Sequence, residues 1–208
     1  MLCFAGGTSS SPETRRQCVQ ALLDAGASPN RLDPQKVHEP ALTYATARGD
    51  PSIVNALLRA GADPNHANAD GWTALMAAVN QGKVSCAIAL IKAGADLEAE
   101  CEPRRRTPLV LAIENSPRMI PILLRAGARL DMNRITQALH DSSQWWPSRD
   151  WAPLELYLEK VDAAGGWKKY EQPHRKRLTT MFTRVLFPHL PIAAISNIVY
   201  FWAHVGFY

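Results

Sequence analysis

The stretch ALLRAGADPN (56–65) decides the fold, because it recurs at nearly fixed spacing along the chain. The other copies are ALLDAGASPN (21–30), ALIKAGADLE (89–98) and ILLRAGARLD (122–131). Gly61, Gly94 and Gly127 are 33 residues apart at each step, and Gly26 lies 35 residues before Gly61. A fixed period of this length indicates stacked supersecondary units, so these residues are predicted to form a solenoid.

Each period contains two apolar segments with helical spacing. The first begins 18 or 19 residues before the glycine, at Leu42, Leu75 and Leu109. The second has paired apolar residues, such as Ile53/Val54 and Leu57/Leu58, that define one buried face. The spacing therefore predicts two short helices joined by a tight turn.

Glycine, proline and aspartate mark the ends of these segments. Each repeat glycine stands where the second helix must stop, and glycine adopts the left-handed cap at little steric cost. Asp70-Gly71 predicts a turn between two extended arms. Pro121 lies inside a second helix and removes a backbone donor, so a distorted first turn is predicted there.

GWTALMAA (71–78), GADPN (61–65) and Thr107-Pro108-Leu109 resemble the ankyrin repeat, with its phrase GxTPLHxAAxxG followed by LLxxGADxN. The resemblance covers residues 21–131 and implies an all-α ankyrin-repeat solenoid of helix-turn-helix units with β-hairpin-like fingers. The histidine of the family phrase is replaced in every copy, by Thr43, Met76 and Val110. Loss of its hydrogen bond is expected to lower local stability without changing the fold.

The chain is predicted to contain three regions. They are ankyrin repeats at 1–131, a degenerate fifth repeat or aromatic cap at 132–166, and a helical F-box-like tail at 167–208. The first copy is partial or carries an insertion, since Leu2 precedes Gly26 by 24 residues rather than 19. The aromatic cap is expected from Trp145, Trp146, Trp151, Leu154 and Leu158, because the end of a solenoid must be covered.

Composition and cysteine usage favour an intracellular protein. The 208 residues carry a formal net charge of +4, which does not indicate nucleic-acid binding without basic residues gathered on one face. Four cysteines show neither metal-ligand spacing nor a disulfide framework, and reduced thiols suit an intracellular compartment. Cys18 and Cys86 occupy the repeat position of Ile53 and are predicted to be small core residues.

The ankyrin resemblance implies a protein partner bound along the finger tips and first helices. Carried over by position, that surface comprises Glu39, Arg48, Trp72, Asn80, Gln81, Arg106 and Glu114. Trp72 is the favoured anchor, because tryptophan is enriched at interface hot spots, and packing against the next finger is its alternative. The run Arg104-Arg105-Arg106 is either a solvated mixed-charge tip or a contact for an acidic partner.

The last 24 residues, from Val185 to Tyr208, contain no charged side chain apart from histidines, and three interpretations stay open. The first is docking to a cullin-type ubiquitin ligase, because an F-box-like pattern resembling that of poxviral-type ankyrin proteins is present at Leu190, Pro191, Ile195, Ile198, Phe201 and Trp202. A related version uses Leu178, Phe182 and Leu186, spaced like the elongin-binding box of the suppressor-of-cytokine-signalling family. The second is a membrane tail anchor, against which the prolines and polar residues count. The third is a structural cap on the solenoid.

No catalytic, cofactor or metal site is predicted. The six histidines are scattered, and Gly165-Gly166 is a linker rather than part of a phosphate-binding loop. His140-Asp141 followed by Ser142-Ser143 is not a triad, because a triad is recognised by its geometry. The predicted function is non-catalytic protein binding, with ligase adaptation as its specific form and a structural ankyrin scaffold as the alternative.

Overall fold

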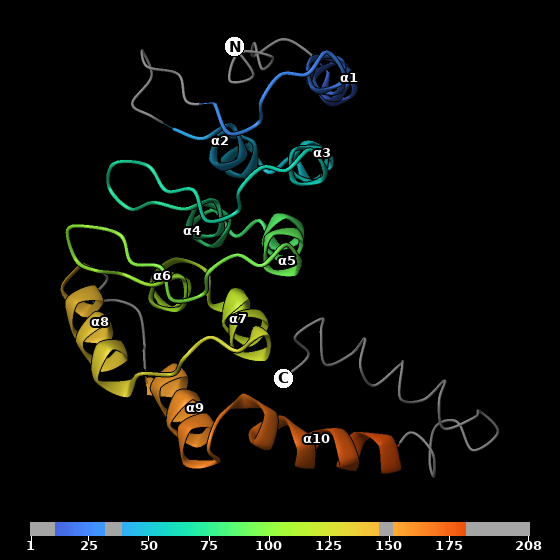
Figure 1. The fold of residues 1–208 in the computed structure, drawn as a ribbon. Helices are drawn as coiled ribbons and strands as arrows, with labels where there is room; N and C mark the ends of the chain where they lie inside the picture. The colour runs from blue at the N-terminus through green and yellow to red at the C-terminus, as the bar shows by residue number, and fades with distance from the viewer. Residues whose placement is uncertain (1–10, 32–38, 146–151, 182–208) are drawn as a thin grey trace. The chain divides into compact units, whose positions relative to one another are not determined.

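A computed structural model of the chain describes residues 11–31, 39–145 and 152–181 (Figure 1). These ranges contain ten α-helices and one short 3₁₀ helix. They are α1 (Pro12–Asp24), α2 (Ala41–Arg48), α3 (Pro51–Arg59), α4 (Ala74–Asn80), α5 (Val84–Lys92), α6 (Pro108–Asn115), η2 (Pro117–Met119), α7 (Ile120–Ala126), α8 (Met132–Trp145), α9 (Ala152–Ala163) and α10 (Trp167–Met181). The chain divides into two compact units, Met1–Arg129 and Leu130–Tyr208.

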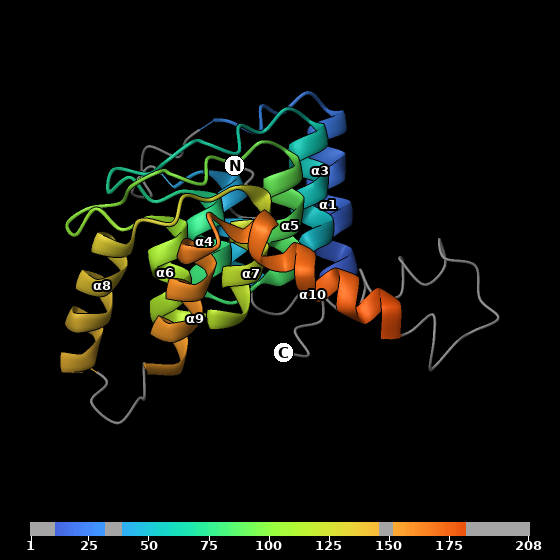
Figure 2. The same ribbon diagram turned by 90° about the horizontal axis from the view of Figure 1, so that it is seen from below.

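The first unit is built from two stacked columns of helices (Figures 1 and 2). The first helices α2, α4 and α6 pack on one another, and the second helices α1, α3 and α5 do the same beside them. Extended fingers project beyond the first helices on the side away from the second helices. The predicted all-α solenoid of helix pairs is confirmed.

The second helices stop at the repeat glycines, as predicted. At the end of α3 the Ala62 N–H donates to the Leu57 carbonyl at 2.9 Å, and the Gly61 N–H donates to the Leu58 carbonyl at 3.1 Å. Gly61 has φ +84°, in the left-handed region that glycine adopts without a Cβ penalty. The same pair of bonds closes α1, α5 and α7, at Gly26, Gly94 and Gly127.

Threonines begin two of the three first helices. Thr73 Oγ1 accepts from the Met76 N–H, and Thr107 Oγ1 accepts from the Val110 N–H, both at 3.4 Å. A hydroxyl at this position satisfies one of the backbone donors that a helix leaves free at its start. Pro40 occupies the same position before α2 and forms no side-chain cap.

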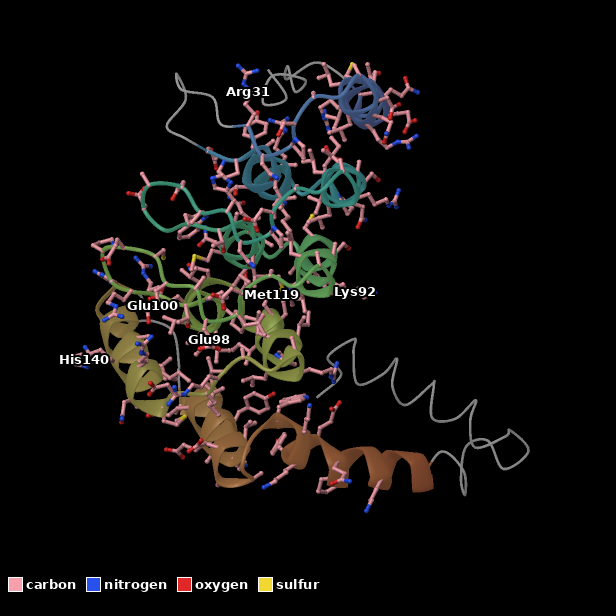
Figure 3. All side chains as sticks on the ribbon, in the orientation of Figure 1. Arg31, Lys92, Glu98, Glu100, Met119 and His140 are labelled. Carbon is pink, nitrogen blue, oxygen red and sulfur yellow. The ribbon has the colours of Figure 1, made fainter. Side chains whose placement is uncertain are left out.

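The core lies between the two columns. In α3, Ile53, Val54 and Leu57 are buried, while Leu58 is half-buried, so the predicted apolar face is present. The distortion predicted from Pro121 is also present, because η2 replaces the first turn and α7 begins only at Ile120. Met119, which ends η2, is fully buried near α6 and α7 (Figure 3).

The prediction that Cys18 and Cys86 are both core residues is half wrong. Cys86 on α5 is 1% exposed, whereas Cys18 on α1 is exposed to solvent. On α1 the neighbouring Val19 takes the buried position, and it is 5% exposed.

The second unit contains α8, α9 and α10, and α9 packs against both of the others. Tyr157, Trp167 and Tyr170 form an aromatic cluster with ring centroids 5.8–6.2 Å apart. Gly165-Gly166, predicted to be a linker, is the C-terminal cap of α9. The Gly165 N–H donates to the Asp162 carbonyl and the Gly166 N–H to the Val161 carbonyl.

Several predictions fall outside the described residues. Trp146 and Trp151 of the predicted aromatic cap lie there, and so does the whole F-box-like pattern at residues 190–202. Leu158 of that cap is described and is fully buried on α9. None of the helices in the described ranges has the length and apolar character needed to cross a lipid bilayer.

Candidate protein-binding surface

The seven predicted contact residues fall in two rows, which together are called the recognition surface. One row immediately precedes the first-helix caps and comprises Glu39, Trp72 and Arg106. The other lies at the C-terminal ends of the first helices and comprises Arg48, Asn80, Gln81 and Glu114. Arg48, Asn80 and Gln81 are exposed, and the other four side chains are half-buried.

The two rows differ from copy to copy, while the framework that carries them is constant. The buried positions of the first helices repeat as Leu42, Leu75 and Leu109, and as Ala45, Ala78 and Ala112. The positions before the caps change from an acid to an indole to a base. A constant core with a varied surface is the arrangement expected where the surface, and not the fold, provides specificity.

At α6, the last of the three first helices, one residue from each row forms an ion pair with the other. Arg106 Nη1 lies 2.9 Å from Glu114 Oε2, with 30% and 11% of the two side chains exposed. The backbones of Cys101 and Arg106 exchange hydrogen bonds of 3.1 Å at the base of the third finger, which fixes the arginine in place. This pair leaves α6 with little net charge at the surface.

Trp72 lies at the base of the second finger. The backbone N–H of Trp72 donates to Asn68 Oδ1 at 2.9 Å, and the backbone carbonyl of Trp72 accepts from the Asn68 N–H at 3.1 Å. The indole is half-buried, so part of it packs on the protein and part stays available for a partner. Asn80 and Gln81 end the first helix α4 of the same repeat with neutral amides, so the centre of the recognition surface is uncharged.

Arg48 is held at the end of α2 by a neighbouring aromatic ring. Its guanidinium lies 5.8 Å from the centroid of the Tyr44 ring, and Nη1 is 3.5 Å from the phenolic oxygen. A cation over an aromatic ring is stabilised electrostatically and loses freedom before any partner binds. The charge at this end of the surface is therefore positioned in advance.

The second and third fingers are locked together. The Glu102 N–H donates to the Asp70 carbonyl at 2.9 Å. Gly71 has φ +75°, and a Cβ there would lie only 2.7 Å from the Glu100 carbonyl oxygen. Arg105 Nε lies 2.6 Å from Glu100 Oε2, so the basic run has one of its charges paired within the finger. Glu102 and Arg104 are both exposed, so charges of both signs lie at the tip.

A ladder of side chains links successive finger roots, and the sequence did not predict it. Asn65 Nδ2 donates to the Gly94 carbonyl at 3.3 Å, and Asn65 Oδ1 accepts from the Asp96 N–H at 2.7 Å. Asn30 makes the equivalent bonds to Gly61 and Asp63. The sequence signal for this ladder is the asparagine that ends the repeated phrase. Its function is visible only when two copies are stacked.

The described residues contain no group of three side chains suited to holding a metal ion. His140 is exposed on α8 (Figure 3). Burial raises the pKa of the Cys86 thiol, and Asp50 adds to this effect. Burial also raises the pKa of Cys101, so both described core thiols are neutral near pH 7 and are poor nucleophiles.

Comparison with known proteins agrees with this architecture. Residues 42–134 match the family model for ankyrin repeats, in three copies. The chain is 35% identical over 157 residues to the B-cell lymphoma 3 protein homolog of Mus musculus, an alignment that covers 72% of this chain and 34% of that protein. It is 35% identical over 120 residues to the nuclear factor NF-kappa-B p105 subunit of Gallus gallus, covering 55% of this chain and 12% of that protein.

A third relative is the ankyrin repeat and SOCS box protein 16 of Homo sapiens. The identity is 36% over 159 residues, which covers 68% of this chain and 35% of that protein. The chain thus spans about a third of the length of two of these relatives and a much smaller part of the third. Ankyrin repeats form interaction modules, so the chain contains a module of the protein-binding type.

Proposed function

We infer that this chain, whose residues 42–134 are ankyrin repeats, recognises a protein partner without catalysing a reaction, through the recognition surface. The observation that carries the inference is the change of side chains at equivalent surface positions on a constant core. Glu39, Trp72 and Arg106 stand at one such position, while the leucine and alanine beneath them do not change. Reduced core thiols fit a module that acts inside cells.

The partner's contact is proposed to centre on the middle repeat. Trp72, Asn80 and Gln81 supply an indole and two amides, and the neighbouring repeats supply charged residues. Interfaces of this kind have an aromatic anchor near the centre and polar groups at the rim. Truncation of Trp72 is therefore expected to weaken binding more than truncation of Arg48.

Photo-crosslinking tests the location of this contact. A benzoylphenylalanine at Gln81 should capture a partner protein from a lysate, and the same residue at Asn55, exposed on the second helix α3, is the matched control. Crosslinks at position 81 that are lost when Trp72 is replaced by alanine support the surface. Equal crosslinking of the same partner at positions 81 and 55, or crosslinking at position 81 that persists without the indole, contradicts it.

The more specific proposal is a substrate-recognition adaptor for a cullin-type ubiquitin ligase. It is supported by the similarity to a protein named for ankyrin repeats and a SOCS box, and by the apolar pattern from Leu190 to Trp202 in the sequence. In this arrangement the repeats hold the partner and the tail binds a linker subunit of the ligase. The alternative is a structural scaffold whose apolar C-terminus is a cap or a membrane tail anchor.

A pull-down from a eukaryotic lysate separates these possibilities. It compares the full chain with a chain truncated after Gly166 and with the double variant Leu190→Asp, Ile198→Asp. Ligase subunits recovered with the full chain alone support the adaptor. Their absence from all three samples, together with insolubility of the truncated chain, favours the scaffold with a capping tail.

A further inference from the structure

Three of the second helices, α3, α5 and α7 with its preceding η2, carry no carboxylate side chain, whereas α1 contains Glu13 and Asp24. Residues 51–59, 84–92 and 117–126 include Arg59, Lys92, Arg118 and Arg125 but no Asp or Glu. The whole chain has 23 basic and 19 acidic residues, so this segregation is not a consequence of overall composition. We call the outward side of α3, α5 and α7 the second-helix face.

Three of these cations are in register. Arg59, Lys92 and Arg125 are 33 residues apart and occupy the same position in the last turn of successive helices. Arg59 and Lys92 are exposed, and Arg125 is half-buried. Lys92 ends α5 in the column opposite the fingers (Figure 3). In the first copy Asp24 stands at this position, so the row begins at α3.

The helix dipole accounts for only part of this pattern. A cation near the C-terminus of a helix is favourable, which explains one basic residue in each last turn. The same dipole favours acids in the first turn, yet α3, α5 and α7 have none there. These three helices therefore carry a net positive charge that helix stability alone does not require.

The surface beside the cations is only weakly polar. Ile88 and Ala89 on α5 and Ile122 on α7 are half-buried, and Ser52 and Asn55 on α3 are exposed. The two isoleucines and the alanine keep part of their apolar surface in contact with water, and a partner could cover it. A partner on this face therefore needs acidic residues for the cations and an apolar stripe for the isoleucines and alanine.

The spacing of the cations selects the partner's conformation. Packed helices are about 8–10 Å apart, which sets the separation of Arg59 and Lys92. In an extended strand, side chains on one face are about 6.7 Å or 13 Å apart, because they alternate between faces. In a helix, residues seven apart lie on one face and are separated by about 10.5 Å. A helix with carboxylates at this interval matches the row.

Nucleic acid fits the row less well. Duplex DNA presents one negative charge about every 1.7 Å along its axis, so a protein that binds it needs a dense basic surface. Here the row has one cation per repeat, Arg118 adds a fourth cation, and apolar side chains lie beside the row. We propose that the second-helix face is a docking surface for an acidic amphipathic helix whose carboxylates recur every seven residues. This surface is separate from the recognition surface and does not depend on it.

The test uses a fluorescein-labelled synthetic peptide of about three heptads, with Glu at every seventh position and Leu on the same face. A peptide of identical composition with Glu five residues apart is the matched control, because that interval turns successive carboxylates to different sides of the helix. Binding of each peptide to the full chain is measured by fluorescence anisotropy at low salt and at 0.5 M salt. A DNA oligonucleotide is measured in parallel.

The full chain is compared with two double variants. The first is Arg59→Glu, Lys92→Glu. The second, Arg48→Glu, Arg104→Glu, is the control, because it changes the net charge by the same amount on the first-helix and finger side. The heptad peptide should bind, and the Arg59/Lys92 variant should weaken binding about tenfold at low salt, whereas the other variant changes it less than about twofold. Circular dichroism checks that both variants are folded. Arg59→Gln, Lys92→Gln provides a milder pair with the same expected direction.

Four outcomes overturn the proposal. In the first, the heptad peptide does not bind, and in the second, both peptides bind equally well. In the third, both charge-reversed variants lose the same affinity for the heptad peptide. In the fourth, the oligonucleotide binds more tightly than the heptad peptide and its binding depends on Arg59 and Lys92. None of them bears on crosslinking at Gln81, so failure here leaves the recognition surface intact.

Discussion

Glu98 Oε1 accepts a hydrogen bond of 2.7 Å from the backbone N–H of Arg129, one repeat further along the chain. Asn65 occupies the equivalent position one repeat earlier and makes two bonds to the next loop, one as donor and one as acceptor. A carboxylate has no proton to donate, so the Glu98 side chain cannot supply the bond that Asn65 gives to a glycine carbonyl. The ladder is thus reduced to a single bond at its last step.

Replacing Asn65 by alanine is expected to destabilise the protein more than replacing Glu98 by alanine. Asn65→Ala removes two hydrogen bonds and should lower the free energy of unfolding by about 1–2 kcal/mol, and Glu98→Ala by about 0.5–1.5 kcal/mol. Urea unfolding followed by circular dichroism measures both. A larger loss for Glu98→Ala would contradict the reduced ladder.

Two glycines with the same backbone conformation should respond differently to alanine. Gly61 and Gly71 have φ +84° and +75°, but only at Gly71 does a Cβ meet backbone, the Glu100 carbonyl at 2.7 Å. Gly61→Ala should cost about 1–2 kcal/mol for the left-handed conformation. Gly71→Ala should cost about 1 kcal/mol more, because the two locked fingers must also move apart. Equal midpoints of urea unfolding would show that the fingers yield freely.

Thr43 offers a stabilising substitution. Its side chain is 1% exposed, and its hydroxyl has no hydrogen-bond partner among the described residues. Thr43→Val keeps the shape and removes a buried polar atom, so the free energy of unfolding should rise by about 1 kcal/mol. The control is Thr46→Val, because Thr46 Oγ1 donates to the Leu42 carbonyl at 2.7 Å. Thermal unfolding should show a higher midpoint for Thr43→Val alone, and a fall in its midpoint would count against the unpaired hydroxyl.

Because two thiols are buried, the free energy of unfolding is predicted to fall at alkaline pH. Burial raises the pKa of Cys86 and Cys101 in the folded chain. As the pH rises, the unfolded chain therefore loses its thiol protons before the folded chain does. The stabilisation that the protonated thiols give to the folded state is complete below the ordinary thiol pKa of about 8.5 and is lost as the pH rises above it. Urea unfolding between pH 7 and pH 10 should show a steeper decline for the natural chain than for Cys86→Ala, Cys101→Ala. Parallel declines would exclude the thiols as the cause.

The repeat and its helix boundaries could be predicted because they depend on local chemistry. A glycine at Gly61, an apolar stripe through Ile53 and Leu57, and a proline at Pro121 each act on the residues beside them. All three consequences are present, as left-handed cap, buried face and 3₁₀ turn. The exposure of Cys18 was missed, because which neighbouring residue of a helix is buried depends on how that helix packs.

The candidate surface was only partly accessible to sequence reasoning. Repeat positions place Arg106 and Glu114 on the correct elements, but their pairing at 2.9 Å depends on side-chain geometry across α6. The Asn65 ladder and the contact of Asp70 with Glu102 join different repeats. Contacts between copies are invisible in a pattern that is read one copy at a time.

The most direct measurement is the affinity of the captured partner for four purified chains. They are the natural chain, Trp72→Ala, the double variant Asn80→Ala, Gln81→Ala, and the control Ser52→Ala, Asn55→Ala on the second-helix face. Recognition through the first helices and fingers predicts at least about a tenfold loss for Trp72→Ala, a smaller loss for the amide pair and no change for the control. Unchanged affinity in the first two variants, with a loss in the control, would contradict the recognition surface.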